Sequence, residues 1–96
     1  MAKLFWEPEA WRTYAALDAQ PRRLQDAVED VLDRLVDDPD QASVRPQGLR
    51  TRGGRRLWRV PIRRFVDDWS LVWLPHPARP DDVLIVYLGP ANYAQG

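Results

Sequence analysis

Residues 53–88, GGRRLWRVPIRRFVDDWSLVWLPHPARPDDVLIVYL, decide the fold of this chain. Three segments within this stretch are rich in β-branched and aromatic residues and are bounded by Gly, Pro or Asp, which is typical of β-strands. These segments are residues 55–62, 68–74 and 82–88. Residues 63–67 are too few for a crossover helix, and residues 75–82 contain three prolines. We therefore expect two hairpin loops and an antiparallel meander.

The first two expected strands alternate between two faces, because successive side chains on a strand point in opposite directions. One face of the first strand carries Trp58, Val60 and Ile62, and the other carries Leu57, Arg59, Pro61 and Arg63. In the second strand the two sets are Trp69, Leu71 and Trp73 against Ser70, Val72 and Leu74. The third strand is apolar on both faces, as in a central strand. Pro61 indicates an edge position or a bulge.

The residues before this stretch predict two helices and two short strands. Pro8 fits the first helical position, and the first helix should stop before Pro21. After Pro21, apolar residues recur with helical spacing up to residue 37, namely Leu24, Val28, Val31, Leu32, Leu35 and Val36. Residues 3–6 and 48–52 are the expected strands, the latter leading into a turn at Gly53-Gly54. The expected fold class is α+β, with an N-terminal helical hairpin packed on an antiparallel β-sheet in a single domain over residues 1–96.

Composition limits the possible chemistry. The 96 residues include no cysteine and one histidine, His76, so a disulfide framework is excluded and a metal site is not expected. No apolar run approaches the ~18 residues of a membrane span, and the N-terminus lacks the pattern of a signal peptide. We expect a cytoplasmic protein with no membrane contact and no cofactor.

The net charge of zero conceals a strong separation along the chain. Residues 1–44 carry a net charge of −5, residues 45–66 carry +8 with eight arginines and no acid, and residues 67–96 carry −3. Two interpretations stay open. The helix acids and sheet arginines neutralise each other in the fold, or the arginine-rich block faces RNA, DNA or an acidic partner.

Four motifs in this order resemble the RelE/ParE superfamily of bacterial toxins. They are the helix closing with VLDRLVDDP, the basic approach GLRTRGGRRLWRV, the strand DDWSLVW, and the final segment VLIVYLGPANY. Members of the family commonly have a helix ending near DP, a basic strand, a DYRVVY-like strand and an apolar strand ending in Gly. The resemblance covers essentially the whole chain, and it implies the toxin of a type II toxin–antitoxin module.

The resemblance implies two possible activities. RelE-like toxins are ribosome-dependent endoribonucleases that cut mRNA, and this is the activity we expect. ParE-like toxins inhibit DNA gyrase, which is the alternative, and a non-enzymatic module that binds nucleic acid or protein is a third possibility. Either kind of toxin is neutralised by a cognate antitoxin, whose acidic or amphipathic segment should cover residues 45–64.

Carried onto this chain, the family pattern gives three candidate catalytic residues. Arg59 matches the basic strand position, Arg56 lies close to it, and Tyr93 corresponds to the C-terminal tyrosine. Two further basic positions of the family fall on Ser70 and Ala91. RNA cleavage needs groups that move protons and cations that stabilise the phosphorane charge. The remaining arginines of the block are candidate nucleic-acid contacts, namely Arg50, Arg52, Arg55, Arg63 and Arg64.

Other candidate residues have simpler interpretations. His76 is expected in a proline-rich loop, solvated rather than catalytic. The pairs Asp67-Asp68 and Asp81-Asp82 are expected to flank hairpin loops. The five tryptophans are expected mainly in the core, although an exposed one on the sheet would stack with a base.

Overall fold

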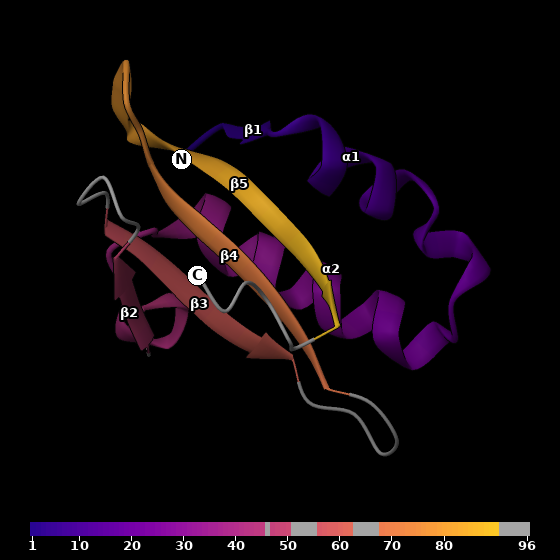
Figure 1. Ribbon diagram of the computed structural model, residues 1–96. Helices are drawn as coiled ribbons and strands as arrows, with labels where there is room; N and C mark the ends of the chain where they lie inside the picture. Colours follow the sequence, from indigo (N-terminus) through magenta and orange to yellow (C-terminus); the bar gives the residue numbers. More distant parts are fainter. Residues whose placement is uncertain (46, 51–55, 63–67, 91–96) are drawn as a thin grey trace.

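The computed structural model describes residues 1–45, 47–50, 56–62 and 68–90 (Figure 1). The elements in chain order are β1 (Leu4–Trp6), α1 (Pro8–Ala15), the 3₁₀ turn η1 (Leu17–Ala19), α2 (Arg22–Asp37), the 3₁₀ turn η2 (Ala42–Val44), β2 (Gln47–Arg50), β3 (Arg56–Ile62), β4 (Trp69–His76) and β5 (Arg79–Pro90). The fold is α+β, with two helices against one sheet. Among the described residues, no helix combines the length and apolar character needed to cross a bilayer.

The sheet is mixed, so the expectation of a purely antiparallel sheet is wrong for β1. Its five strands are ordered β1-β5-β4-β3-β2, and neighbouring strands from β2 to β5 are antiparallel, as predicted. β1 pairs with β5 in parallel, with Leu4 opposite Val83 and Trp6 opposite Ile85. No hairpin joins these two strands, so no tight turn dictates their relative direction. The apolar pattern of residues 3–6 predicted a strand but contained no information about its orientation.

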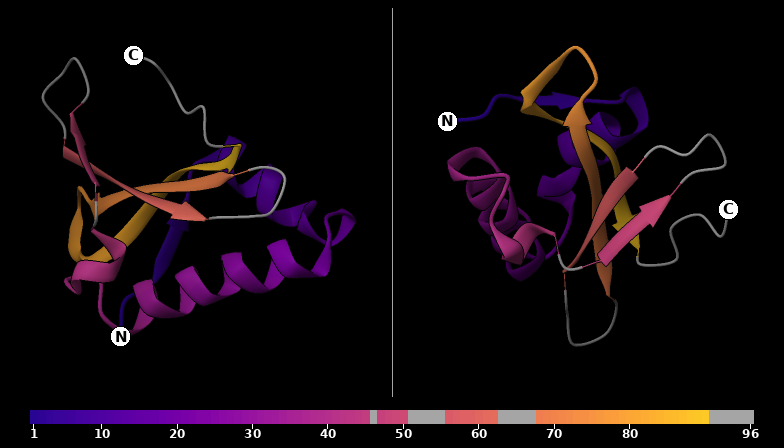
Figure 2. Two further views of the ribbon diagram at one scale, coloured as in Figure 1. Left: turned by 90° about the horizontal axis from the view of Figure 1, so that it is seen from below. Right: turned by 90° about the vertical axis from the view of Figure 1, so that its left-hand side faces the viewer.

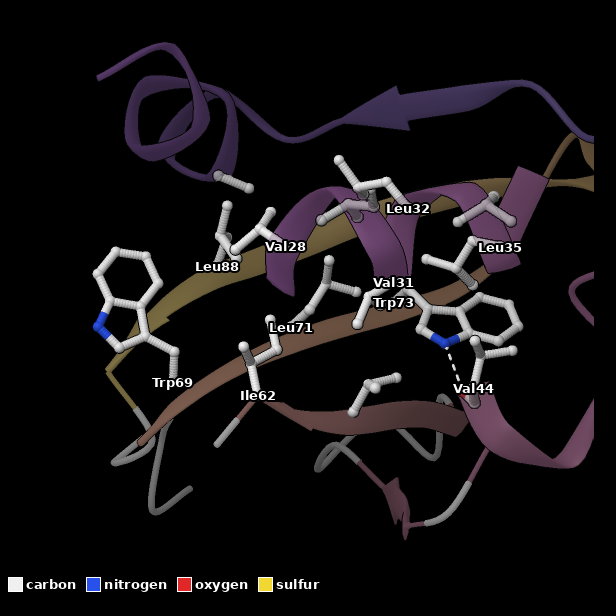
Figure 3. Packing of buried hydrophobic residues seen from close by; sticks show 14 of the residues in the cluster. Val28, Val31, Leu32, Leu35, Val44, Ile62, Trp69, Leu71, Trp73 and Leu88 are labelled. Atoms are coloured by element: carbon white, nitrogen blue, oxygen red, sulfur yellow. Dashed lines mark hydrogen bonds between the residues drawn. The ribbon is translucent and has the colours of Figure 1, made fainter. Parts of the chain in front are cut away.

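The helices pack against one face of this sheet, with α2 running across it and α1 beside β5 (Figure 2). Helix α2 begins after Pro21, which is its N-cap residue, and ends at Asp37, as the sequence predicted. Its buried residues are Leu24, Val28, Val31, Leu32 and Leu35. They meet the helix-facing side chains of the sheet, including Leu71 and Trp73, in one core cluster (Figure 3). The predicted alternation of β3 and β4 is therefore confirmed.

The β4–β5 hairpin is longer than expected. Residues 75–82 were predicted to form its loop, but β4 extends to His76 and β5 begins at Arg79, which leaves a turn at residues 77–78. Prolines are tolerated there because the ladder is one-sided at this end of the hairpin. Pro75 lies beyond the last residue of β4 that pairs with β3, and Pro80 precedes the part of β5 that pairs with β1.

Pro61 follows the same rule within β3. The pairing of β2 covers β3 only from Arg56 to Arg59, so the backbone around Pro61 has β4 as its sole strand neighbour among the described residues. The expectation that Pro61 marks a local edge is confirmed. Ser70, the residue of β4 that pairs with Pro61, therefore lies in the part of the sheet that β2 does not reach.

Candidate nucleic-acid interface

β3 distributes its arginines between the two faces of the sheet. Arg56 is exposed and shares the helix-facing side with Trp58, and its guanidinium carbon lies 4.8 Å from the centre of the Trp58 ring. Arg59 is three residues further along, so it points to the opposite face together with Leu57. The structure therefore does not bring the two predicted catalytic arginines together on one surface.

Arg59 belongs to a row of three residues that crosses three strands. It pairs with Val72 of β4, and Val72 pairs with Tyr87 of β5. Because adjacent strands lie about 4.8 Å apart, the backbones of Arg59 and Tyr87 are separated by roughly 10 Å. This distance is short enough for an arginine and a tyrosine side chain to converge on one small group above the row.

The neighbouring row holds both side chains in place. The Nε–H of Arg59 donates a hydrogen bond of 2.9 Å to the hydroxyl oxygen of Ser70, a residue with no exposed surface. Ser70 pairs directly with Gly89 of β5. Because the bond uses Nε, Ser70 fixes the orientation of the guanidinium plane. A buried serine thus orients a half-buried arginine.

Tyr87 leans toward this same row. Its hydroxyl donates a hydrogen bond of 2.6 Å to the carbonyl oxygen of Pro90. A Cβ atom at Gly89 would lie only 3.0 Å from the Tyr87 hydroxyl oxygen, so the phenol occupies the space that a side chain there would fill. The Arg59 guanidinium thus contacts Ser70 and the phenol lies next to Gly89, so the two side chains lie at the two members of one β4–β5 pair.

A β-bulge places Tyr87 on this face. Val72 pairs with Tyr87 but the next residue, Trp73, pairs with Ile85, which leaves Val86 as the extra residue. Val86 and Tyr87 consequently both pack against the second cluster, whereas Ile85 belongs to the helix-facing core. Without the bulge, strict alternation would turn Tyr87 toward the helices. Sequence reasoning missed Tyr87 for this reason, and the available signal was a phenol that needs a polar partner inside an apolar strand.

Arg45, the first residue of the arginine-rich block, contacts other residues of the chain through its guanidinium. Its guanidinium donates hydrogen bonds to the carbonyl of Pro39 and, at 2.8 Å, to the carboxylate of Asp40. Its guanidinium carbon also lies 5.0 Å from the Trp58 ring centre and 5.3 Å from that of Trp73. For this one residue, neutralisation within the fold is the correct interpretation of the charge block.

The other predicted residues have the following positions. The backbone of Arg50 pairs with Arg56 at the end of β2. His76 lies at the far end of β4 from Ser70, where its ring packs 4.7 Å from that of Phe5 and its Nδ1 accepts a hydrogen bond from the Ala78 backbone. Asp81 and Asp82 lie within β5, so the expectation that they flank a hairpin loop is wrong, because the β4–β5 ladder continues past the prolines. Further predicted residues lie outside the described residues, namely Arg52, Arg55, Arg63, Arg64, Asp67, Ala91 and Tyr93. No group of His, Cys, Asp and Glu in the described part of the chain could hold a metal ion.

No protein-family model matches this chain, and no significant match is found among curated proteins or solved structures. The RelE/ParE resemblance therefore rests on the sequence motifs alone. The arrangement of Arg59, Ser70 and Tyr87 is an independent observation, made from the geometry of the sheet.

Proposed function

We propose that the protein is the toxin of a bacterial type II toxin–antitoxin module and acts as a RelE-like, ribosome-dependent mRNA endoribonuclease in the cytoplasm. The observation that carries this proposal is that the Arg59 guanidinium contacts Ser70 while the Tyr87 phenol lies next to Gly89, the residue that pairs with Ser70. It supplies a cation and a proton donor side by side on the sheet face opposite the helices.

Each group has a role in RNA cleavage. In the reaction, the ribose 2′-hydroxyl loses its proton to a base, which can be solvent water, and attacks the adjacent phosphate. Negative charge builds on the non-bridging oxygens, the bond from phosphorus to the 5′ oxygen breaks, and the products are a 2′,3′-cyclic phosphate and a 5′-hydroxyl that has taken up a proton. Arg59 stabilises the charge on the phosphate oxygens through its guanidinium, and the Ser70 bond to Nε fixes the plane of this group. Tyr87 protonates the leaving oxygen, since an ordinary phenol is protonated at neutral pH. Tyr93 stays a predicted acid–base residue.

The partner that we propose is a small antitoxin. An acidic or amphipathic antitoxin segment would bind the arginine-rich block and cover Arg59. Arg45 is excluded from this contact surface, because it already pairs with Asp40 and packs against two tryptophan rings. A pull-down with the protein encoded beside this one tests the partner, and no binding at micromolar concentration would contradict it.

One observation favours a second candidate, the ParE-like gyrase inhibitor. The strand position where RelE/ParE members carry an arginine is Ser70 here, and Ser70 is fully buried beneath Arg59. The single histidine lies at the other end of β4 and packs against Phe5. A cationic surface with few proton-transfer groups suits binding to a protein target as well as phosphate chemistry.

Induced expression in bacteria distinguishes the candidates. The nuclease predicts arrest of translation with new mRNA ends that depend on ribosomes, and it predicts that Tyr87→Phe abolishes these ends. Tyr14→Phe is the matched control, because it also removes a phenol that donates a hydrogen bond, but on the helix side. DNA breaks and an SOS response without mRNA ends would favour the gyrase inhibitor. No effect on growth would favour the non-enzymatic binding module.

A further inference from the structure

A second surface, formed mainly by α1 and α2, is aromatic and acidic, whereas the sheet face that carries Arg59 is cationic. Trp6, Trp11 and Tyr14 form an aromatic cluster at the start of the chain, in which Trp6 stacks on Tyr14 with ring centres 4.7 Å apart. Trp11 contacts both rings at 5.8 Å, yet half of its own surface, 50%, is exposed. Apart from the terminal Met1, Trp11 is the only large hydrophobic side chain exposed in the described part of the chain.

The exposed ring borders a cleft of about 500 Å³ between α1 and the first half of α2. The cleft is lined by Trp11, Tyr14, Ala15, Leu17, Asp18, Arg22, Gln25, Asp26 and Glu29. Its charged lining therefore comprises three carboxylates and one guanidinium. Leu17, which also lines the cleft, is buried and belongs to the core cluster, so this part of the lining is fixed by core packing.

The carboxylates of the cleft are placed where they can pair with a cation. One carboxylate oxygen of Glu29 accepts a hydrogen bond of 2.6 Å from the Tyr14 hydroxyl, which positions the carboxylate next to the aromatic rings. The ion pair of Arg22 with Asp26 spans 3.6 Å between two strongly exposed side chains, so it is readily exchanged for a better partner. The pKa of Tyr14 is raised to about 12, mainly by the hydrogen bond to Glu29, with burial and the charges of Glu29 and Asp33 adding to it.

We propose that this aromatic cleft binds an arginine or lysine side chain from a basic segment of a protein partner. A cation over the Trp11 face gains from the ring quadrupole, and Glu29 is close enough to pair with it. Arginine fits best, because its planar guanidinium both stacks on an indole and binds a carboxylate in a bidentate manner. The partner segment is thus opposite in charge to the one expected at Arg59, and the inference does not depend on the nuclease proposal.

An extended segment fits better than a small free cation. Asp33 and Asp37 follow Glu29 at successive intervals of four residues on α2, so the three carboxylates lie on one side of the helix. All three carboxylates are exposed. They form an acidic ridge along α2 that extends about 12 Å from the cleft. Ion pairs recorded within the described residues of α2 use Asp26 and Asp30 but none of these three carboxylates. A chain with several basic residues can occupy the cleft and the ridge together.

The test uses the full chain and a peptide of alternating arginine and glycine, at near-physiological salt. Binding is measured by calorimetry and mapped by NMR, with the Trp11 indole N–H as the expected site of the largest shift. Trp11→Ala and Glu29→Gln should each weaken binding by about tenfold or more. Asp81→Asn, which removes an exposed carboxylate on another element, should leave the affinity unchanged. Glu29→Gln keeps an oxygen that can accept the Tyr14 hydroxyl, and thermal melting verifies that each variant is folded.

The proposal is overturned by any of three results. Equal losses for Asp81→Asn and Glu29→Gln would mean diffuse attraction by the net charge of the surface. Equal binding of a peptide in which neutral citrulline replaces arginine would exclude the cation as the recognised group. Equal affinity for spermidine would show a site for small cations rather than for a protein segment.

Discussion

The two faces of the β3–β4–β5 sheet are formed by alternating residues of the same three strands, and they differ in what they carry. The face toward the helices buries a continuous apolar core that includes Leu71 and Trp73. The opposite face has a cluster of only three buried apolar residues, Leu57, Val72 and Leu74, and beside it lie Arg59, Ser70 and Tyr87. Alternation along β3 and β4 sorts these sets, whereas a bulge in β5 assigns Tyr87. The main apolar core therefore lies on one face of the sheet, and the candidate site lies on the other.

The largest effect should follow from emptying the helix-facing core at Trp73. This ring has no exposed surface, and its Nε1–H donates a hydrogen bond of 2.8 Å to the carbonyl of Val44. Trp73→Ala should lower the free energy of unfolding by about 3–5 kcal/mol, as measured by urea denaturation. Leu57→Ala, in the smaller cluster on the other face, should cost about 2 kcal/mol. If the two losses are equal, the faces do not differ in stability as described.

Gly89→Ala should produce a smaller loss of stability with a large loss of activity. The new methyl group would press on the Tyr87 hydroxyl and displace it from the Pro90 carbonyl, which removes one hydrogen bond worth about 1 kcal/mol. Toxicity should fall because the phenol leaves its position beside Arg59. Gly48→Ala is the control, since its methyl would meet the Trp58 ring at an ordinary contact distance of 3.4 Å. Equal activity of the two variants would exclude Tyr87 from the site.

The smallest expected effect concerns Tyr14 and pH. Its pKa of about 12 in the folded protein exceeds the value of roughly 10 expected in the unfolded chain. The folded state thus holds the phenol proton more tightly, so this contribution to stability is complete below pH ~10 and is lost as the pH rises to ~12. Because the pair is largely exposed, the loss should stay under about 1 kcal/mol. Glu29→Gln should lower the Tyr14 pKa in an ultraviolet titration of tyrosinate, and an unchanged curve would contradict the assigned cause.

The sequence was sufficient for much of the fold because its signals were local. The helical spacing of apolar residues after Pro21 predicted α2 to within a residue at either end, and period-two alternation assigned the faces of β3 and β4. The direction of β1 escaped prediction because it depends on contacts with β5, almost eighty residues away. The length of the β4–β5 hairpin was misjudged because proline was treated as a loop signal, without regard to which side of the strand lacked a partner.

The candidate site was predictable only in part, for the same reason. Alternation alone assigned Arg59 to the face opposite the helices. Arg56 was nevertheless predicted to join it in one site, although residues three positions apart on a strand point to opposite faces. Tyr87 depends on a bulge whose position is set by pairing with β4, and a single-strand pattern contains no such information. The role of Arg45 required knowledge that Asp40 and two tryptophans surround it.

The most direct test of the account compares Arg59→Ala with Arg56→Ala in induced cells. Both arginines come from β3. Arg56→Ala should melt close to the wild type, because its side chain is exposed. Arg59→Ala should stay folded but lose about 1 kcal/mol of stability, because the buried Ser70 hydroxyl loses a hydrogen-bond partner. Mapping of mRNA ends should show that Arg59→Ala loses roughly 10²–10³ in cleavage rate, the usual cost of removing one donor from a preorganised site. Arg56→Ala should retain most of the cleavage, because its guanidinium lies over Trp58 on the other face. If Arg56→Ala abolishes cleavage while Arg59→Ala remains active, the assignment of chemistry to the face opposite the helices is wrong.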